Sequence, residues 1–235
     1  IGNIGLPQFV KGYIEKEALF AVNEIKADML AIHLNSLQEV SQPEGDLFFK
    51  NGIEILKKLK ERLPFPVIVK ETGAGISKET AEKLTFLDGV DVAGIGGTSW
   101  SAVEYYRSKA HKETVKKLWN WGIPTPLSIA ECRASGIKTI IGSGGVRTGF
   151  DIAKCIALGA SACGIALPFL KLAVEEDVDG LIEMIETLKR EFKIAMFLNS
   201  CQRVYDLKTR PLFLKGELSQ LMQQRGMDFH YFNYR

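Results

Sequence analysis

The sequence predicts a parallel α/β fold, in which helices cover the faces of a sheet of apolar strands. Short runs rich in β-branched and apolar residues alternate along the chain with amphipathic helical patterns. Within these runs most positions are apolar rather than every second one, which is typical of strands that helices bury on both faces. The expected strands are residues 1–5, 29–34, 67–70, 90–96, 139–144 and 162–167.

Amphipathic patterns between these runs predict helices at residues 14–25, 52–62, 77–87, 100–121, 127–135 and 150–158. Ser77 is a residue type that caps helix starts, and Gly159 follows an expected helix end. Residues 171–235 also read as helical, with helices over 181–198 and 215–225. Trp119 and Trp121 flank a helix end and are expected to pack there.

Two architectures fit this alternation, an open doubly wound sheet and a (β/α)8 barrel. The spacing of the units favours the barrel, and nearly every strand ends in polar or glycine residues, where both architectures place active sites. Five strands and one strand end are too few to close a barrel, so we expect two or three units to precede residue 1. We therefore predict one (β/α)8 barrel domain over residues 1–235, whose first strands are absent and whose residues 171–235 are closing helices.

Composition excludes several classes of function. The formal charge is only +2 and the basic residues are dispersed, which gives no sign of nucleic-acid binding. No apolar run approaches the length of a membrane span. The four cysteines show no C-x-x-C spacing and are expected to be reduced structural thiols, which fits a cytoplasmic protein.

Polar side chains gather where the second strand ends. A strand alternates its side chains, so His33 and Asn35 point the same way, and Gln38 and Glu39 follow within one turn. A single histidine on a strand is more often a core residue. Four such groups together favour a bound anion, with a carboxylate able to ligate Mg²⁺. His111 and His230 lack such a setting and are expected at the surface.

Glycine-rich turns follow three other strands. The segment from Gly142 to Gly149 precedes a helix, and Gly164-Ile165-Ala166-Leu167-Pro168 ends the next strand. Glycines let backbone N–H groups approach an anion, and the last two strands of a barrel commonly build a phosphate site. Two tight turns are the alternative interpretation, but the two strand ends together are more specific than either alone and favour a phosphate site. Lys70 ends another strand, and facing an anionic ligand is favoured there over pairing with Glu71. The segment from Gly94 to Trp100 allows a flat ligand to lie close to the backbone, although glycine-rich turns of this kind are common.

These residues resemble the type 2, FMN-dependent isopentenyl-diphosphate isomerases over almost the whole chain. The matching segments are Asn3-Ile4-Gly5, His33-Leu34-Asn35, Gln38-Glu39, Gln42-Pro43-Glu44-Gly45, Val67-Ile68-Val69-Lys70-Glu71, Gly75-Ile76-Ser77, Gly96-Gly97-Thr98-Ser99-Trp100, Trp121-Gly122-Ile123-Pro124-Thr125, Gly142 to Arg147, and Ala166-Leu167-Pro168. The glycine-rich segments occur in many FMN barrels, whereas the His-x-Asn-x-x-Gln-Glu run with its Gln-Pro-Glu-Gly tail is more specific.

The resemblance implies a barrel that uses reduced FMN and Mg²⁺ to interconvert isopentenyl and dimethylallyl diphosphate in isoprenoid biosynthesis, with NADPH as reductant. His33, Asn35 and Gln38 would bind the substrate and Glu39 would hold the metal. The resemblance implies that FMN is bound by Asn3, Lys70, Ala93, Thr98, Gly145, Val146, Arg147, Ala166 and Leu167. No protein residue is assigned as acid or base, because the reduced flavin would carry the protons. A homotetramer or homo-octamer is expected, with no nucleic-acid or membrane partner.

Two departures and two alternatives accompany this prediction. Ala93 stands where the family often carries Ser, and the family's N-terminal segments, which contact the diphosphate and the flavin, are absent. One alternative is an FMN-dependent 2-hydroxy-acid oxidase or dehydrogenase, but residues 128–133 lack the histidine of the expected His-Gly-Gly-Arg-type segment. The other alternative is a barrel that binds flavin or phosphate without turnover.

Overall fold

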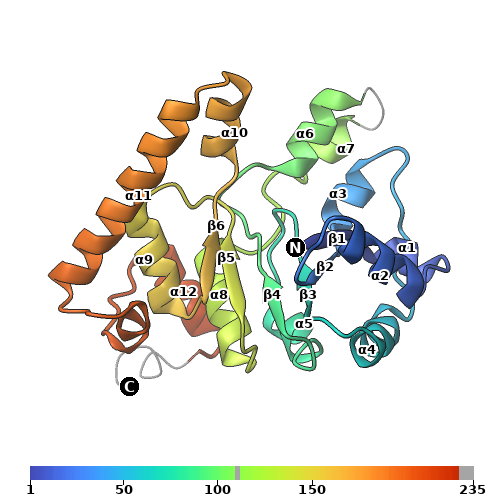
Figure 1. The fold of residues 1–235 in the computed structure, drawn as a ribbon, viewed down its shortest axis with the longest axis horizontal. Helices are drawn as coiled ribbons and strands as arrows, with labels where there is room; N and C mark the ends of the chain where they lie inside the picture. The colour runs from blue at the N-terminus through green and yellow to red at the C-terminus, as the bar shows by residue number, and fades with distance from the viewer. Residues whose placement is uncertain (109–111, 228–235) are drawn as a thin grey trace.

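The computed structural model describes residues 1–108 and 112–227. Its centre is a six-stranded, wholly parallel sheet whose spatial order β1-β2-β3-β4-β5-β6 follows the chain (Figure 1). The strands are β1 (Gly2–Gly5), β2 (Leu30–His33), β3 (Val67–Lys70), β4 (Gly89–Asp91), β5 (Ile140–Ser143) and β6 (Ala162–Gly164). Sequential parallel order with a helical connection after each strand is the arrangement of a (β/α)8 barrel. β1 and β6 form the two edges, so the described sheet is a barrel two strands short of closure.

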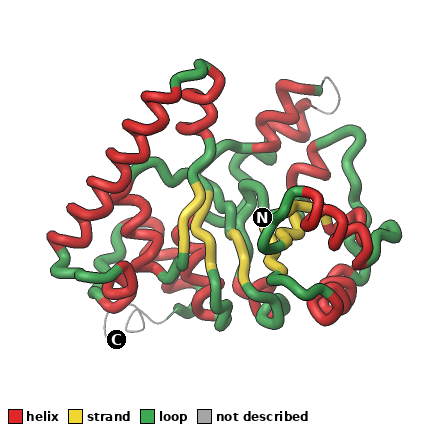
Figure 2. Tube along the Cα trace, in the orientation of Figure 1, coloured by secondary structure: helices red, strands yellow, loops and turns green. Residues whose placement is uncertain are grey.

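Helices surround the strands, as the red and yellow tubes of Figure 2 show. The helices before β5 are α1 (Leu6–Val10), α2 (Glu15–Glu24), α3 (Ser36–Ser41), α4 (Gly52–Arg62), α5 (Lys78–Glu82), α6 (Trp100–Arg107), α7 (Lys112–Lys116) and α8 (Thr125–Ala134). Those after β5 are α9 (Gly149–Leu158), α10 (Leu167–Val174), α11 (Val178–Leu198), the 3₁₀ helix η1 (Val204–Thr209) and α12 (Gly216–Gln224).

Strand register separates two sets of side chains. Ile32, Val69, Val90 and Ile140 occupy one row across the sheet and are at most 1% exposed, because they face the surrounding helices. The alternate positions face the barrel interior. On this inner side, the last residues of β2, β3 and β4 form a row of His33, Lys70 and Asp91. The sheet thus supplies an apolar core outside and a polar layer at the mouth.

Several sequence-based bounds were wrong. The strand expected at 162–167 ends at Gly164, because Leu167 already begins α10 with Pro168 in its first turn. The helix expected at 77–87 spans only Lys78–Glu82, and the residues after it form turns. The strand expected at 90–96 is Gly89–Asp91, since the backbone turns at Ala93, whose φ is +34°.

The helix expected at 100–121 is divided into α6 and α7, whose junction includes residues outside the described part of the chain. Among the described residues, the sequence did not predict the helices α1, α3 and α10. Trp119 packs edge to face against Tyr105 with ring centroids 5.2 Å apart, as expected. Trp121 is 66% exposed, so its expected packing role was wrong.

The C-terminal helices pack on the outside of the sheet's helical layer. α11 runs along α9, and α12 lies against α8. Arg225, which follows α12, fixes this contact through the Glu131 carboxylate on α8, with 2.6 Å between Nε and Oε1. Among the described residues, no helix is long and apolar enough to cross a membrane.

Candidate functional site

The mouth of the partial barrel brings together residues from four neighbouring strands. Gly5, His33, Lys70 and Asp91 are consecutive register partners on β1 to β4. Register partners share one face of a sheet, so the three side chains of this row stand beside one another on the inner side. The sequence predicted His33 and Lys70 here but did not identify Asp91.

His33 lies between Asn3 and Lys70. Its Nδ1 atom is 3.2 Å from Oδ1 of Asn3, an acceptor, so Nδ1 carries the proton in this contact. Burial, and then the charge of Lys70, lower the pKa of His33 below its ordinary value. The imidazole is therefore neutral at pH 7, with Nε2 left as an acceptor. Asn3, predicted as a flavin ligand, is exposed on β1 and positions His33 in this structure.

A line of hydrogen bonds runs from Lys70 to α3. Lys70 Nζ donates to Thr72 Oγ1 at 3.3 Å, and this hydroxyl donates to Asn35 Oδ1. Asn35 Nδ2 then lies 3.4 Å from Gln38 Oε1. Asn35 can begin α3 because it adopts a left-handed backbone conformation, with φ of +51°, which Asn tolerates better than most residues. Three predicted residues, Lys70, Asn35 and Gln38, are thus joined through Thr72.

Glu104 continues this line and was missed from the sequence. It lies on α6, is 2% exposed, and accepts hydrogen bonds from Gln38 at 3.1 Å, Gln42 at 2.8 Å and Arg107 at 2.6 Å. Arg107 also pairs with Glu44. Burial raises the pKa of Glu104, but the bonds from Gln42, Arg107 and Gln38 outweigh it and hold the pKa below its ordinary value.

Asp91 was also missed. Its Oδ1 atom accepts hydrogen bonds from Ser143 Oγ at 2.5 Å and from Ala93 N at 3.3 Å. Burial raises the pKa of Asp91, although the Ser143 bond and the positive charge of Lys70 oppose that rise. The carboxylate in Val90-Asp91-Val92 can be recognised from the sequence as one at a strand end. Its partner Ser143 cannot be recognised in this way, because it is 52 residues away.

Glu39, predicted to hold Mg²⁺, lies half-buried on α3. Its Oε2 atom accepts a hydrogen bond from the backbone N–H of Asp46 at 2.7 Å, which ties α3 to the following loop. No group of three or more His, Cys, Asp or Glu side chains within residues 1–108 and 112–227 could hold a metal ion. A cation at Glu39 would therefore need most of its oxygens from a bound anion and water, which is how Mg²⁺ commonly binds.

The glycine-rich loop after β5 presents unpaired donors. In the part of the chain that the structure describes, the backbone N–H groups of Gly144, Gly145 and Val146 donate no hydrogen bond. Gly144 and Gly145 have φ of +102° and +86°, a conformation that turns successive N–H groups toward one point. Three consecutive free donors before the N-terminus of α9 fit a phosphate group, the anionic end of FMN.

This loop packs against the glycine-rich segment after β4. A Cβ on Gly145 would lie 2.3 Å from the Gly96 carbonyl oxygen, and one on Gly144 would lie 2.2 Å from that of Gly94. Arg147 Nη1 donates to the carbonyl oxygens of Gly145 at 2.7 Å and Gly96 at 3.3 Å. The glycines therefore allow the two loops to approach each other closely, and they also orient the free N–H donors.

The other predicted flavin residues surround this loop. Thr98 is exposed beyond Gly97 at the mouth. The Ala93 carbonyl accepts from the N–H groups of Gly73 at 2.7 Å and Gly75 at 3.2 Å, so its backbone oxygen already holds the turn after β3. Ala166 and Leu167 begin α10 next to the Gly144 loop, since Ser143 and Gly164 are register partners.

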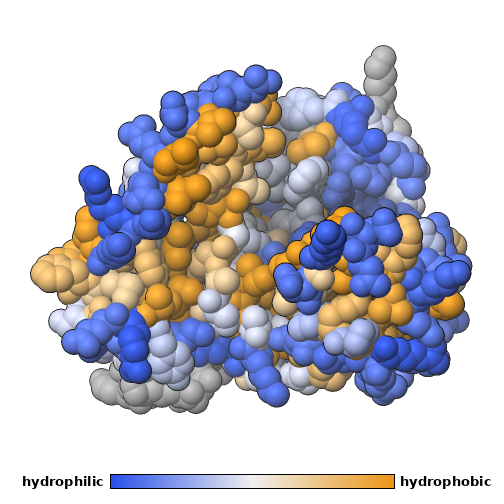
Figure 3. All heavy atoms as spheres, in the orientation of Figure 1, coloured by the Kyte–Doolittle hydropathy of each residue, from blue (hydrophilic) through white to orange (hydrophobic). Residues whose placement is uncertain are grey.

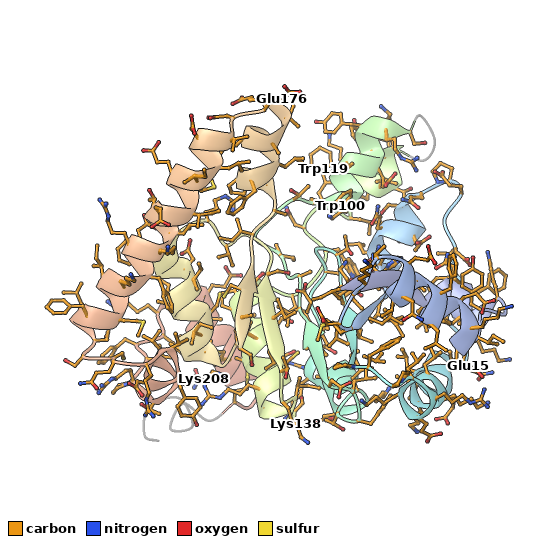
Figure 4. All side chains as sticks on the ribbon, in the orientation of Figure 1. Glu15, Trp100, Trp119, Lys138, Glu176 and Lys208 are labelled. Atoms are coloured by element: carbon orange, nitrogen blue, oxygen red, sulfur yellow. The ribbon has the colours of Figure 1, made fainter. Side chains whose placement is uncertain are left out.

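Two tryptophans stand over the mouth beside the α6–α7 pair (Figure 4). Trp100 begins α6 and is 40% exposed. Its Cδ1 atom lies 3.7 Å from the Cβ position built on Gly73, in the turn that leaves β3. An exposed ring above a polar row suits an apolar substrate chain. His111 and His230, predicted as surface residues, lie outside the described residues.

A family model, curated proteins and solved structures all match this chain. Residues 49–213 match the family described as FMN-dependent dehydrogenase. The isopentenyl-diphosphate delta-isomerase of Pyrococcus furiosus is 46% identical over 233 residues, spanning 96% of this chain and 59% of that protein. The one from Archaeoglobus fulgidus is 45% identical, spanning 95% and 65%. The chain thus spans about 60% of the length of the first curated relatives it matches.

Solved structures of similar shape have the same fold. A mandelate oxidase bound to benzoyl-formic acid superposes with a TM-score of 0.56 at 19% identity, covering 88% of this chain and 67% of that one. Another mandelate oxidase structure, with a monooxide FMN adduct, gives 0.56 at 20% identity over 83% of this chain and 58% of that one. At such low identity, the similarity shows only that the proteins share a fold.

Proposed function

Because the chain belongs to the family of FMN-dependent dehydrogenases, we propose that it forms the flavin-binding part of an isopentenyl-diphosphate delta-isomerase. The observation that carries this proposal is the 45–46% identity to proteins of that name over about 95% of the chain. Those proteins are longer, so the proposed activity, interconversion of isopentenyl and dimethylallyl diphosphate, belongs to the whole polypeptide and serves isoprenoid biosynthesis.

FMN fits the glycine-rich loops described above. The free N–H groups of Gly145 and Val146, with Arg147, would hold its phosphate, and Ala166 and Leu167 would flank it. Lys70 would stand at the ring with its positive charge, near Thr98 and Asn3. When bound and reduced, FMN supplies the acid–base chemistry that moves the double bond, which agrees with the lack of an assigned protein acid or base.

The polar row at the mouth would bind the substrate's diphosphate. In neutral His33 the Nε2 atom can only accept a hydrogen bond. It would therefore accept one from a water molecule or from a protonated phosphate oxygen. Asn35 and Gln38 would each donate the second N–H of their amide, since the first N–H of Asn35 bonds Gln38 and that of Gln38 bonds Glu104. Mg²⁺ held by Glu39 and the diphosphate would neutralise the anion and anchor it, leaving the alkene under Trp100.

The proposal has four further parts. NADPH supplies the reducing electrons, and the protein works in the cytoplasm. The chain forms a single barrel domain, and the protein assembles as a homotetramer or homo-octamer. No nucleic acid or membrane is proposed as a partner.

The test is an isomerase assay on the full-length protein with FMN, Mg²⁺ and a reductant supplied. Glu39→Gln should abolish turnover or shift the Mg²⁺ requirement to far higher concentration, because one metal oxygen is lost. Glu54→Gln is the matched control, since Glu54 is exposed on α4 and, within the described residues, its carboxylate pairs with Lys57 alone. Unchanged turnover and Mg²⁺ dependence in the Glu39 variant would remove the metal role from Glu39. Absence of isomerisation by the wild type would overturn the function.

The alternative oxidase function is less well supported. Residues 128–133, whose lack of histidine argued against it, lie in α8 away from the mouth, where Ser128 bonds the backbone of Ile76. The segment at the mouth is Ile95-Gly96-Gly97-Thr98, which has the glycine pair of a His-Gly-Gly-Arg segment but neither its His nor its Arg. Hydrogen peroxide production from a 2-hydroxy acid would restore this alternative.

A further inference from the structure

Thr125 contacts the glycine-rich loop after β5 from the first residue of α8. It is 3% exposed, and its hydroxyl oxygen lies 2.7 Å from the carbonyl oxygen of Gly144, 3.1 Å from that of Ser143 and 3.4 Å from that of Ile95. A hydroxyl donates one proton, so the shortest contact, with Gly144, is its hydrogen bond. The backbone N–H of Thr125 donates to Ile95 at 3.1 Å, which keeps the start of α8 in place without the hydroxyl.

The hydrogen bond to Gly144 is one of three that hold successive peptide groups of this loop. The carbonyl oxygen of Ser143 accepts from the N–H of Gly94 at 3.1 Å, that of Gly144 from Thr125 at 2.7 Å, and that of Gly145 from Arg147 Nη1 at 2.7 Å. In a trans peptide the N–H points away from the C=O of the same plane. Each held carbonyl therefore fixes the direction of the N–H that follows it. Within the described residues these are the unpaired donors of Gly144, Gly145 and Val146.

The middle peptide of the three has the weakest backbone restraint. It lies between Gly144 and Gly145, whose φ angles are +102° and +86°. Glycine has no Cβ to limit rotation, so a peptide between two glycines turns over at little cost. Such a flip would replace the N–H of Gly145 with a carbonyl oxygen, which repels an anion. The hydroxyl of Thr125 opposes the flip because it would lose its acceptor.

The helix next to the loop offers a phosphate few charged side chains. α10 has one charged residue, Lys171, which lies in its last turn. Figure 3 shows apolar residues gathered over α10 and α11. A phosphate bound at the loop would therefore depend on the backbone donors, and thus on the direction in which they point.

We propose that Thr125 is a positioning residue for the FMN phosphate, because it keeps the N–H of Gly145 turned toward the anion. This inference rests on the FMN site of the proposed function and adds a residue that acts through the loop backbone. It also limits the effect to one part of the cofactor. The hydroxyl should matter for a flavin that carries the terminal phosphate and should matter little for riboflavin, which lacks it.

The experiment measures the dissociation constants of FMN and of riboflavin for the full-length protein by flavin fluorescence quenching. Thr125→Val keeps the β-branched shape and the backbone N–H but removes the hydroxyl. We expect its dissociation constant for FMN to rise about tenfold, the effect of one lost hydrogen bond, while that for riboflavin stays within about twofold of the wild type. Thr125→Ser restores the hydroxyl and should bind both flavins as the wild type does.

Ser128→Ala is the matched control for the loss of a buried hydroxyl. Ser128 lies on the same helix, is 0% exposed, and donates to the carbonyl oxygen of Ile76 at 2.8 Å, away from the loop after β5. Its substitution should leave the ratio of the two dissociation constants unchanged, because no donor of the loop is turned.

The two flavins separate positioning from a general role in folding. An unchanged FMN constant in Thr125→Val, a parallel weakening or loss of both flavins, or an equal effect on FMN in Ser128→Ala would each overturn the role of Thr125. A wild type that binds FMN no more tightly than riboflavin would remove the phosphate site itself, and with it the FMN part of the proposed function. Isomerase activity is not the readout, so absence of turnover would overturn the proposed function and leave this result intact.

Discussion

Oε1 of Glu104 on α6 accepts a hydrogen bond from Nε2 of Gln38 on α3, with 3.1 Å between the two atoms. This bond joins a residue that the sequence marked as a substrate ligand to a buried carboxylate that it did not mark. The carboxylate also accepts hydrogen bonds from Gln42 and Arg107, so it fixes the orientation of three donor side chains at once. Its charge is what lets one side chain accept from all three.

Glu104→Gln should therefore raise the KM for the diphosphate substrate more than it lowers kcat. The amide has one acceptor oxygen and adds its own N–H donors, so Gln38 loses its fixed orientation. We expect unfolding to become easier by about 2 kcal/mol, the usual cost of a lost bond to a charged group. Steady-state kinetics and urea denaturation measure the two effects. Equal kinetics in the variant would show that the orientation of Gln38 is unimportant.

The salt bridge between Arg225 and Glu131 should be a measurable part of the stability. Glu131 is 1% exposed, and Arg225→Ala would leave it only the N–H of Lys78 at 2.8 Å. We expect a loss of about 2 kcal/mol, because a buried carboxylate loses its charged partner. Arg62→Ala is the control, since the Arg62–Glu15 pair is exposed at both ends and should contribute much less to the stability. Similar losses in both variants would contradict the assigned role of burial.

Glu71 should make the protein less stable at alkaline pH. It is 5% exposed, and burial raises its pKa to about 7, although Thr72 N–H and Lys70 oppose the rise. The folded protein therefore binds this proton more tightly than the unfolded chain. Stability is fully present below the unfolded value near 4.5 and falls as pH rises through about 7.

Glu71→Gln removes this penalty. The variant should gain at most about 3 kcal/mol over the wild type at pH 8 and little at pH 4. Urea denaturation at both pH values measures the difference. A gain of the same size at both would mean that the charge of Glu71 is not the cause.

His33 should act in the opposite direction with pH. Burial and Lys70 lower its pKa, so between the folded value and the unfolded value near 6.5 the unfolded chain binds more protons. Stability should rise as pH increases through this interval and level off above it. NMR titration should place the His33 pKa below 6.5, and His33→Gln should flatten the stability curve over the interval. A pKa above 6.5 would contradict the packing against Lys70.

The sequence predicted most of what lies within one strand or one turn. Val67–Lys70 was located to the residue because an apolar β-branched run ends in a charge there. His33, Asn35 and Lys70 were placed at the mouth because strand alternation and strand ends are local signals. Leu167 was misplaced in a strand because the Pro168 signal for a helix start was outweighed by the apolar run before it.

The sequence did not predict contacts between segments that are far apart in the chain. Glu104 binds Gln38 across 66 residues, and Asp91 binds Ser143 across 52. Neither carboxylate has a local pattern that distinguishes it from a solvated one, since its role depends on which helix packs over which strand.

Gly144 should tolerate no side chain. Its φ is +102°, and a Cβ there would lie 2.2 Å from the Gly94 carbonyl oxygen and 2.6 Å from Thr125 Oγ1. Gly144→Ala must therefore push apart the loops after β4 and β5, which would scatter the free N–H donors of Gly145 and Val146. We expect a lower melting temperature and a FMN dissociation constant at least tenfold higher.

Gly136→Ala is the matched control for this change. Gly136 also has a positive φ, +86°, but nothing lies within 4 Å of its Cβ position. Its substitution carries only the backbone strain, roughly 1–2 kcal/mol. Flavin fluorescence quenching and thermal melts distinguish the two variants. If Gly144→Ala bound FMN as tightly as Gly136→Ala, the loop after β5 would not hold the phosphate, and the strain at Gly144 would serve only the contact with Gly94.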